Sequence, residues 1–245
     1  MTDGLLLLHA FPLDASMWEP QTTALAGDVT TVAPNFPGFG GAPLGAPSVG
    51  MDAAADDAAR ALDHAGLDRA AVCGLSMGGY VALALWRRHR ERVAGLVLAN
   101  TRAGADDDEG KERRRALAER LRSEGSEFLV EKPPPLLSAN APEELWARVR
   151  GIIRDQAADA IAAASLGMAD RPDSTGGLAG IDVPTLVITS TGDTLIPPAA
   201  STPMAEQIPG ARLDVIADAG HLSNLEAPEA FNRLLREHLR AAGIL

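Results

Sequence analysis

The fold is decided by residues 70–84, which read AAVCGLSMGGYVALA. The small and apolar residues up to position 75 predict a short buried strand, and the run from Tyr80 predicts an apolar helix. Between them, Gly74, Ser76 and Gly78 form a G-x-S-x-G pattern at a sharp strand-to-helix turn. A serine at the tip of such a turn has strained backbone angles, so its neighbours two positions away must lack bulky side chains.

This turn would hold the Ser76 hydroxyl at a helix N-terminus. Backbone N–H groups and the positive end of the helix dipole favour developing negative charge there. Gly79 would let the new helix pack close to the sheet. The pattern therefore indicates a nucleophilic serine. The alternative is a glycine-rich turn that carries an incidental serine.

Composition narrows the class of protein. The chain has 245 residues and 46% apolar content, enough for one large domain with a sizeable core. Its 22 Lys and Arg against 33 Asp and Glu give a net charge of −11, which argues against nucleic acid or an anionic membrane as partner. We find neither a signal-peptide pattern nor a membrane span in the sequence, and we expect a cytoplasmic protein.

Metal and cofactor motifs are missing from the sequence. There is no C-x-x-C, no H-E-x-x-H and no phosphate-binding loop, so we expect neither a metal nor a cofactor. The single cysteine, Cys73, lies inside the predicted strand and cannot form an internal disulfide. The expected partner is a small molecule, and the chain is expected to be a monomer or a homodimer.

Strands and helices alternate along the first hundred residues. Predicted strands span 5–9, 29–33, 70–75 and 93–99, and predicted helices span 15–25, 49–65 and 76–90. Trp18 and Leu25 are expected on the inner face of the first helix. This alternation predicts a mostly parallel sheet with helices on both faces.

The alternation breaks after Asn100 and resumes near Pro184. Residues 103–172 contain no convincing strand and read as helices near 106–115, 142–154 and 156–169. We interpret the charged run 111–115 as a solvated helix face. Strands at 184–190 and 211–216 and helices at 201–208 and 228–241 complete an α/β core of about six strands. The predicted division is a core of residues 1–102 and 173–245 with a helical cap at 103–172.

A serine nucleophile needs a base, and the base needs an orienting acid. Polar side chains collect at the carboxyl ends of parallel strands, where Asp193 and His221 follow the last two predicted strands. These two residues are our candidates for acid and base. The competing acids are better explained locally: Asp14 and Asp218 as turn residues, and Asp182 as a residue that precedes its strand. The remaining helical histidines are expected to face solvent, namely His64, His89 and His238.

The negative oxygen of a tetrahedral intermediate needs two donors. We expect them to be the backbone N–H groups of Met77, directly after the serine, and of Phe11, in the loop after the first strand. The pocket around them is expected to be mostly apolar and to take a small acyl group. The predicted pocket residues are Leu136, Leu137, Trp146 and Leu222.

Five matching pieces make the chain resemble the α/β-hydrolase fold family over nearly its whole length. They are residues 9–12, residues 34–40, residues 74–79, Asp193 with Pro197, and Gly220 with His221. The family's order of nucleophile, acid and base is also kept. Within the family the chain resembles small esterases, lactonases and cofactor-free haloperoxidases. Residues 100–102, with the short helical cap before residues 172–175, are similar to 3-oxoadipate enol-lactonase-like proteins.

Two departures from the family pattern affect the expected fold. The usual His-Gly of the oxyanion loop is His9-Ala10 here, although the backbone donor survives. Only four residues precede the strand at Leu5, whereas family members usually carry an antiparallel hairpin there. We therefore expect this hairpin to be missing, and the strand at 29–33 to become an exposed sheet edge.

The resemblance and the residues together predict a serine hydrolase of carboxylic esters or lactones that forms an acyl-enzyme through Ser76, His221 and Asp193. A haloalkane dehalogenase would need a carboxylate at position 76, and an amidase would need an anchor for the amine. A cofactor-free perhydrolase would use the same three residues and stays open. So does a hydrolase-fold ligand-binding protein whose site is vestigial.

Overall fold

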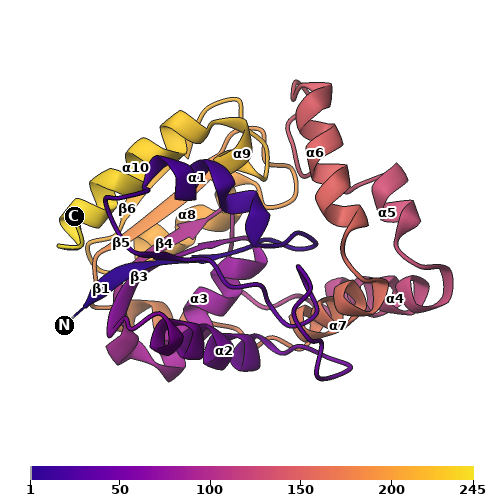
Figure 1. Cartoon of the computed structure of the whole chain (residues 1–245), viewed down its shortest axis with the longest axis horizontal. Coiled ribbons are helices and arrows are strands. Elements are labelled where there is room, and N and C mark those ends of the chain that lie inside the picture. Colours follow the sequence, from indigo (N-terminus) through magenta and orange to yellow (C-terminus); the bar gives the residue numbers. More distant parts are fainter. Residues whose placement is uncertain (1) are drawn as a thin grey trace.

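The computed structural model describes residues 2–245, which form a six-stranded sheet with helices on both faces (Figure 1). Every pair of neighbouring strands is parallel, in the order β2-β1-β3-β4-β5-β6. This confirms the predicted fold class. The strands are β1 (Asp3–Leu8), β2 (Thr31–Val32), β3 (Arg69–Leu75), β4 (Val93–Ala99), β5 (Thr185–Ser190) and β6 (Arg212–Ile216).

The central strands are apolar because both of their faces are covered. Leu5 to Leu8 of β1 have no exposed surface, and every residue of β4 is buried. Their register aligns the carboxyl ends of three strands, since Leu8 pairs with Gly74 and Gly74 pairs with Leu98. The loops that follow β1, β3 and β4 therefore meet at one end of the sheet.

The edge next to β1 is shorter than predicted. β2 is the edge strand, as expected, but only Thr31 and Val32 pair with β1 instead of the whole stretch 29–33. One further bond, from Leu5 N–H to the carbonyl of Thr30, extends the contact. Pro34 has no N–H to donate, which limits pairing at the other end.

The sheet lies between two groups of helices. In Figure 1, α1 and α10 lie above the sheet and α2 and α3 lie below it. The bounds of the core helices are α1 (Glu19–Ala24), α2 (Met51–His64), α3 (Met77–Arg88), α8 (Pro198–Gln207), α9 (Ser223–Glu226) and α10 (Pro228–Ala241). Shorter 3₁₀ turns occupy Ala15–Trp18, Arg90–Arg92 and Thr175–Gly180.

The first predicted helix, 15–25, divides into a 3₁₀ turn and α1, which has Pro20 in its first turn. Trp18 and Leu25 are fully buried, as predicted.

Four helices follow β4 without a strand between them and stand to one side of the sheet (Figure 1). They are α4 (Asp108–Glu124), α5 (Glu127–Glu131), α6 (Glu143–Arg154) and α7 (Ala158–Ala169). α4 packs against α7, where Ser165 Oγ donates a 2.9 Å hydrogen bond to the carbonyl of Arg114. Sequence patterns had not indicated α5. No helix among residues 2–245 is long and apolar enough to cross a lipid bilayer.

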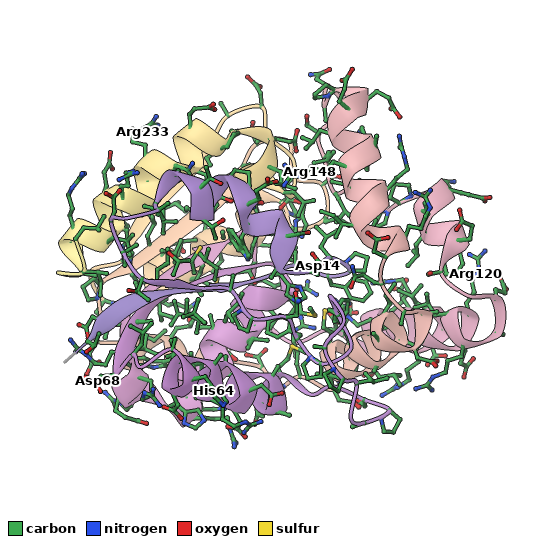
Figure 2. All side chains as sticks on the ribbon, viewed as in Figure 1. Asp14, His64, Asp68, Arg120, Arg148 and Arg233 are labelled. Carbon is green, nitrogen blue, oxygen red and sulfur yellow. The ribbon has the colours of Figure 1, made fainter. Side chains whose placement is uncertain are left out.

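One of the three helical histidines departs from its predicted position. His64 faces solvent on α2 (Figure 2), and His89 is half-buried and contacts Asp56. His238, however, is only 5% exposed. Its Nε2 is buried without a hydrogen-bond partner among the described residues, and burial and then the charge of Arg212 lower its pKa to about 4. The apolar face of α10, formed by Phe231, Leu235 and Leu239, extends to this histidine.

Candidate active site

The turn between β3 and α3 holds Ser76 in a strained conformation, with φ of 55° and ψ of −114°. Glycine is needed on both sides. A Cβ on Gly74 would lie 2.2 Å from the carbonyl oxygen of Gly78, and a Cβ on Gly78 would lie 2.0 Å from that of Leu8. The Ser76 N–H donates to the carbonyl of Ala99 at 3.0 Å. The backbone is thus fixed on every side, and the side chain stays at the surface of a cavity.

The predicted acid and base lie in hydrogen-bond contact. His221 Nδ1 is 2.8 Å from Oδ2 of Asp193, and both side chains are almost completely buried. The other carboxylate oxygen accepts hydrogen bonds of 2.9 Å from the N–H groups of Leu195 and Ile196. Burial would raise the pKa of Asp193, but the hydrogen bonds and the charge of His221 outweigh it and hold that pKa below its usual range. Asp193 is therefore an ionised acceptor, and Nδ1 of His221 carries the proton.

Asn100 extends this pair, and sequence patterns did not identify it as a site residue. Its amide nitrogen donates to Asp193 Oδ2 at 2.9 Å and to Ser190 Oγ at 2.7 Å. Its amide oxygen accepts a 2.6 Å bond from Ser223 Oγ. Asn100 is fully buried with φ of 44°. A polar residue directly after the apolar strand β4 was the available signal.

The loop that carries His221 is fastened by Glu226. This carboxylate accepts hydrogen bonds from the N–H of Gly220 at 2.7 Å and from the N–H of Ser138 at 3.0 Å. Next to it, the Leu222 N–H donates to the carbonyl of Leu136 at 2.8 Å. The position of His221 is consequently tied to the segment before α6.

Ser76 and His221 line the same cavity, whose volume is about 370 Å³. No hydrogen bond joins the Ser76 hydroxyl to His221 among residues 2–245, a separation that is common before a substrate binds. The walls come from distant parts of the chain. Besides these two residues, the lining consists of Phe11, Pro12, Tyr80, Arg102, Arg113, Arg114, Leu117, Leu129, Pro134, Leu136, Met168, Leu195 and Ile196.

The two residues expected to supply the oxyanion donors come from the loop after β1 and from the start of α3. Phe11 lines the cavity, and Met77 is the first residue of α3. Neither backbone N–H donates a hydrogen bond within the described chain. His9 supports the loop before Phe11, because its Nδ1 lies 3.1 Å from the carbonyl of Ala10 and its Nε2 accepts from the N–H of Phe36 at 3.1 Å. Burial lowers the pKa of His9 to about 4, which keeps this ring neutral.

The predicted pocket residues separate into two groups. Leu136 lines the cavity, whereas Leu137, Trp146 and Leu222 are not among its lining residues. Leu137 and Leu222 belong to the buried core, and Trp146 is half-buried against that core. The face of α6 that carries Trp146 is thus used for helix packing.

Most residues of the cavity wall are apolar, as expected, but the wall also includes three cations. They are Arg102, Arg113 and Arg114. The run 111–115 was interpreted as a solvated helix face, and Arg113 is indeed exposed, whereas Arg114 is half-buried. Helical spacing alone could not show this, because the relevant face of α4 is set by its packing on α7.

The comparisons with known proteins agree with this architecture. A model of the Alpha/beta hydrolase family matches residues 5–234. A thermophilic esterase from Thermogutta terrifontis, solved with malate bound, is 40% identical with a TM-score of 0.94, over 99% of this chain and 90% of that one. The enol-lactonase from Burkholderia xenovorans is 29% identical with a TM-score of 0.89, over 96% of this chain and 90% of that one.

Among curated relatives, the pimeloyl-[acyl-carrier protein] methyl ester esterase of Aromatoleum aromaticum is 30% identical over 96% of this chain and 98% of its own length. Esterases and lactonases therefore recur among the relatives, and the match extends along almost the whole sequence. The chain belongs to the alpha/beta hydrolase family.

Proposed function

We propose that the protein is a serine hydrolase that cleaves a small carboxylic ester or lactone. The observation that carries this proposal is the 2.8 Å contact between His221 and Asp193 beside a cavity that Ser76 also lines. The related esterases and lactonases support the substrate class.

In this mechanism Ser76 Oγ attacks the carbonyl carbon of the substrate. Since Nδ1 of His221 faces Asp193, its Nε2 is the nitrogen available to take the serine proton. The N–H groups of Phe11 and Met77 would stabilise the oxyanion. The alcohol leaves with the proton from His221, and water, activated by the same imidazole, releases the acid from Ser76.

Residues 103–172 act in this proposal as the cap, over a core of residues 1–102 and 173–245. The cap contributes Leu117, Leu129, Leu136 and Met168 to the cavity walls. Apolar walls exclude water from the reacting carbonyl, which strengthens the electrostatic interactions inside.

Turnover of p-nitrophenyl acetate by wild type, Ser76→Ala and His221→Ala tests the proposal. We expect each substitution to lower kcat by about 10³-fold or more, because the triad acts as a unit. Turnover that persists in Ser76→Ala would refute the mechanism. A wild type that turns over no ester, with this fold intact, would favour a vestigial ligand-binding site.

A further inference from the structure

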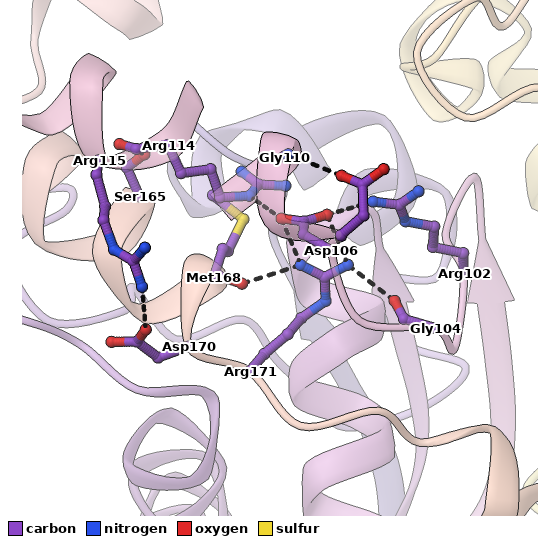
Figure 3. Close-up of polar contacts among 11 residues, drawn as sticks. Arg102, Gly104, Asp106, Gly110, Arg114, Arg115, Ser165, Met168, Asp170 and Arg171 are labelled. Carbon is purple, nitrogen blue, oxygen red and sulfur yellow. Dashed lines mark hydrogen bonds and ion pairs between the residues drawn. The ribbon is translucent and has the colours of Figure 1, made fainter. Parts of the chain in front are cut away.

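The cavity is bordered by an unusual arrangement of charge, the arginine cluster, which we define as Arg102, Arg114 and Arg171 around Asp106 (Figure 3). Asp106 is only 6% exposed. Arg171 donates to both of its carboxylate oxygens, at 2.9 and 3.1 Å. Arg102 and Arg114 each contact Asp106 as well.

The arginine cluster has more positive than negative charge. Burial would raise the pKa of Asp106, but the hydrogen bonds from Arg171 and Arg114 outweigh it and hold that pKa well below its usual range. Asp106 is therefore ionised and neutralises one of three guanidinium groups. Arg113 adds a further cation at the cavity, paired with Glu109 on the exposed surface of α4.

The three arginines differ in position: Arg171 is buried, whereas Arg102 and Arg114 line the cavity. Arg171 lies 4.1 Å above the ring of Tyr80 and also donates to the carbonyls of Met168 and Gly104 at 2.9 Å. Arg102 and Arg114, by contrast, each use one nitrogen on Asp106.

Several guanidinium donors at the cavity lack an acceptor. In the described chain no acceptor is recorded for Nη1 of Arg102 or for either terminal nitrogen of Arg114. Arg102 Nε is buried without a partner. None of the residues that line the cavity is an Asp or Glu. An anion at this wall would thus meet N–H donors of Arg102 and Arg114 that have no acceptor within residues 2–245, where Asp106 would be the one carboxylate paired with these two arginines.

The other walls restrict what such an anion can be attached to. Besides the arginines and Ser76, the lining includes the apolar side chains Leu117, Leu129, Met168 and Ile196. A volume of about 370 Å³ suits a small molecule and not a long chain. A molecule with an ionised group at the end of a short hydrocarbon chain would match both the cationic and the apolar parts of the wall.

We propose that the cavity selects an ester or lactone whose acyl part ends in a second, ionised carboxylate, which Arg102 and Arg114 bind. This inference rests on the proposed function, because it assigns the acyl part of the substrate that would become attached to Ser76. The chain as a whole has a net charge of −11, so the attraction would be local to the arginine cluster.

A pair of esters of equal shape tests the inference. Monomethyl glutarate carries the carboxylate, and methyl glutaramate replaces it with a neutral carboxamide. From methanol release we expect wild type to have a kcat/KM for the glutarate ester at least about tenfold higher. Arg102→Met should remove most of this preference, and Arg102→Lys should restore part of it.

Two further variants distinguish the loss of a positive charge at the cavity from a disturbance of the folded structure. Arg113→Met removes a cavity cation that does not contact Asp106. We expect it to lower the preference for the glutarate ester without disturbing the buried pair of Asp106 and Arg171. Arg115→Met is the matched control on the same helix, since Arg115 faces Asp170 and does not line the cavity. The preference should be the same in Arg115→Met as in wild type.

The substrate inference is overturned if wild type cleaves the carboxamide as well as the acid, or if Arg102→Met lowers both rates equally. In either case the proposed hydrolase function stands, because ester cleavage is observed. If no ester is cleaved, the hydrolase proposal fails, and the anion site is judged by calorimetry of glutarate with Ser76→Ala. Binding that Arg102→Met abolishes supports the site, and no binding to Ser76→Ala overturns it.

Discussion

Asn100 Nδ2 donates a 2.9 Å hydrogen bond to Oδ2 of Asp193, the same oxygen that lies 2.8 Å from Nδ1 of His221. The amide and the imidazole therefore share one oxygen of the carboxylate. Ser190 and Ser223 in turn hold the amide. In the proposed mechanism Asn100 is a positioning residue that acts on His221 through Asp193.

Replacement of Asn100 by glycine removes the amide and keeps a residue that tolerates the positive φ. We expect kcat on an ester substrate to fall about tenfold with little change in KM, and the free energy of unfolding to fall by about 1–3 kcal/mol because buried partners lose a hydrogen bond. Steady-state kinetics measure the change in kcat and KM, and urea unfolding measures the change in the free energy of unfolding. Asn140→Gly, at an exposed position, is the control. Lost stability at full kcat would leave Asn100 a purely structural role.

The close contact at Gly78 makes a strong prediction about folding. A methyl group there would lie 2.0 Å from the carbonyl oxygen of Leu8, and backbone cannot yield as a side chain can. Gly78→Ala should therefore lower the free energy of unfolding by several kcal/mol, about 3 or more, or prevent folding. Thermal unfolding followed by circular dichroism provides the measurement.

Gly151→Ala is the matched substitution, because Gly151 lies in α6 with nothing within 4 Å of the added Cβ. We expect it to stabilise the protein by about 0.5–1 kcal/mol. Equal effects at the two glycines would show that the packing of the turn on β1 is looser than described.

His238 should make the protein less stable in mild acid. Its pKa in the folded chain is lowered to about 4 from its ordinary 6.5, so between these values the unfolded chain binds a proton that the folded chain does not. Stability is therefore lost as pH falls from about 6.5 to about 4. His238→Leu should reduce the stability difference between pH 7.5 and pH 5 by about 2 kcal/mol.

Urea unfolding at both pH values checks this expectation, with His64→Leu as the control because His64 is exposed. Buried His9 adds a loss of the same sign, so His238→Leu should retain part of the acid sensitivity. An unaltered pH dependence in His238→Leu would contradict the assigned burial.

A mostly parallel sheet of about six strands could be predicted because local signals agree with the final fold. The apolar run at Leu5–Leu8 is buried in β1, and the glycines of the Ser76 turn meet backbone at close range. The positions of Asp193 and His221 followed from the same logic, since both come after strands whose carboxyl ends meet. Their contact is now described, whereas their catalytic roles stay a prediction.

The walls of the cavity could not be predicted in the same way. Arg113 and Arg114 belong to a charged run that resembles any solvated helix face, and both line the cavity although Arg113 remains exposed. Trp146 was predicted to line the pocket because it is a large apolar residue, but its side chain packs against the hydrophobic core. Amphipathic patterns show that a helix has a buried face, but they do not show what that face contacts.

Labelling with a fluorophosphonate, followed by peptide mass spectrometry, tests the central claim most directly. The probe forms a covalent adduct only where a serine is activated by a correctly placed base. We predict one adduct, on the peptide that contains Ser76, and a labelling rate that falls by orders of magnitude in His221→Ala. A folded wild type that stays unlabelled at Ser76, or labelling at Ser76 that is equally fast in His221→Ala, would contradict the account.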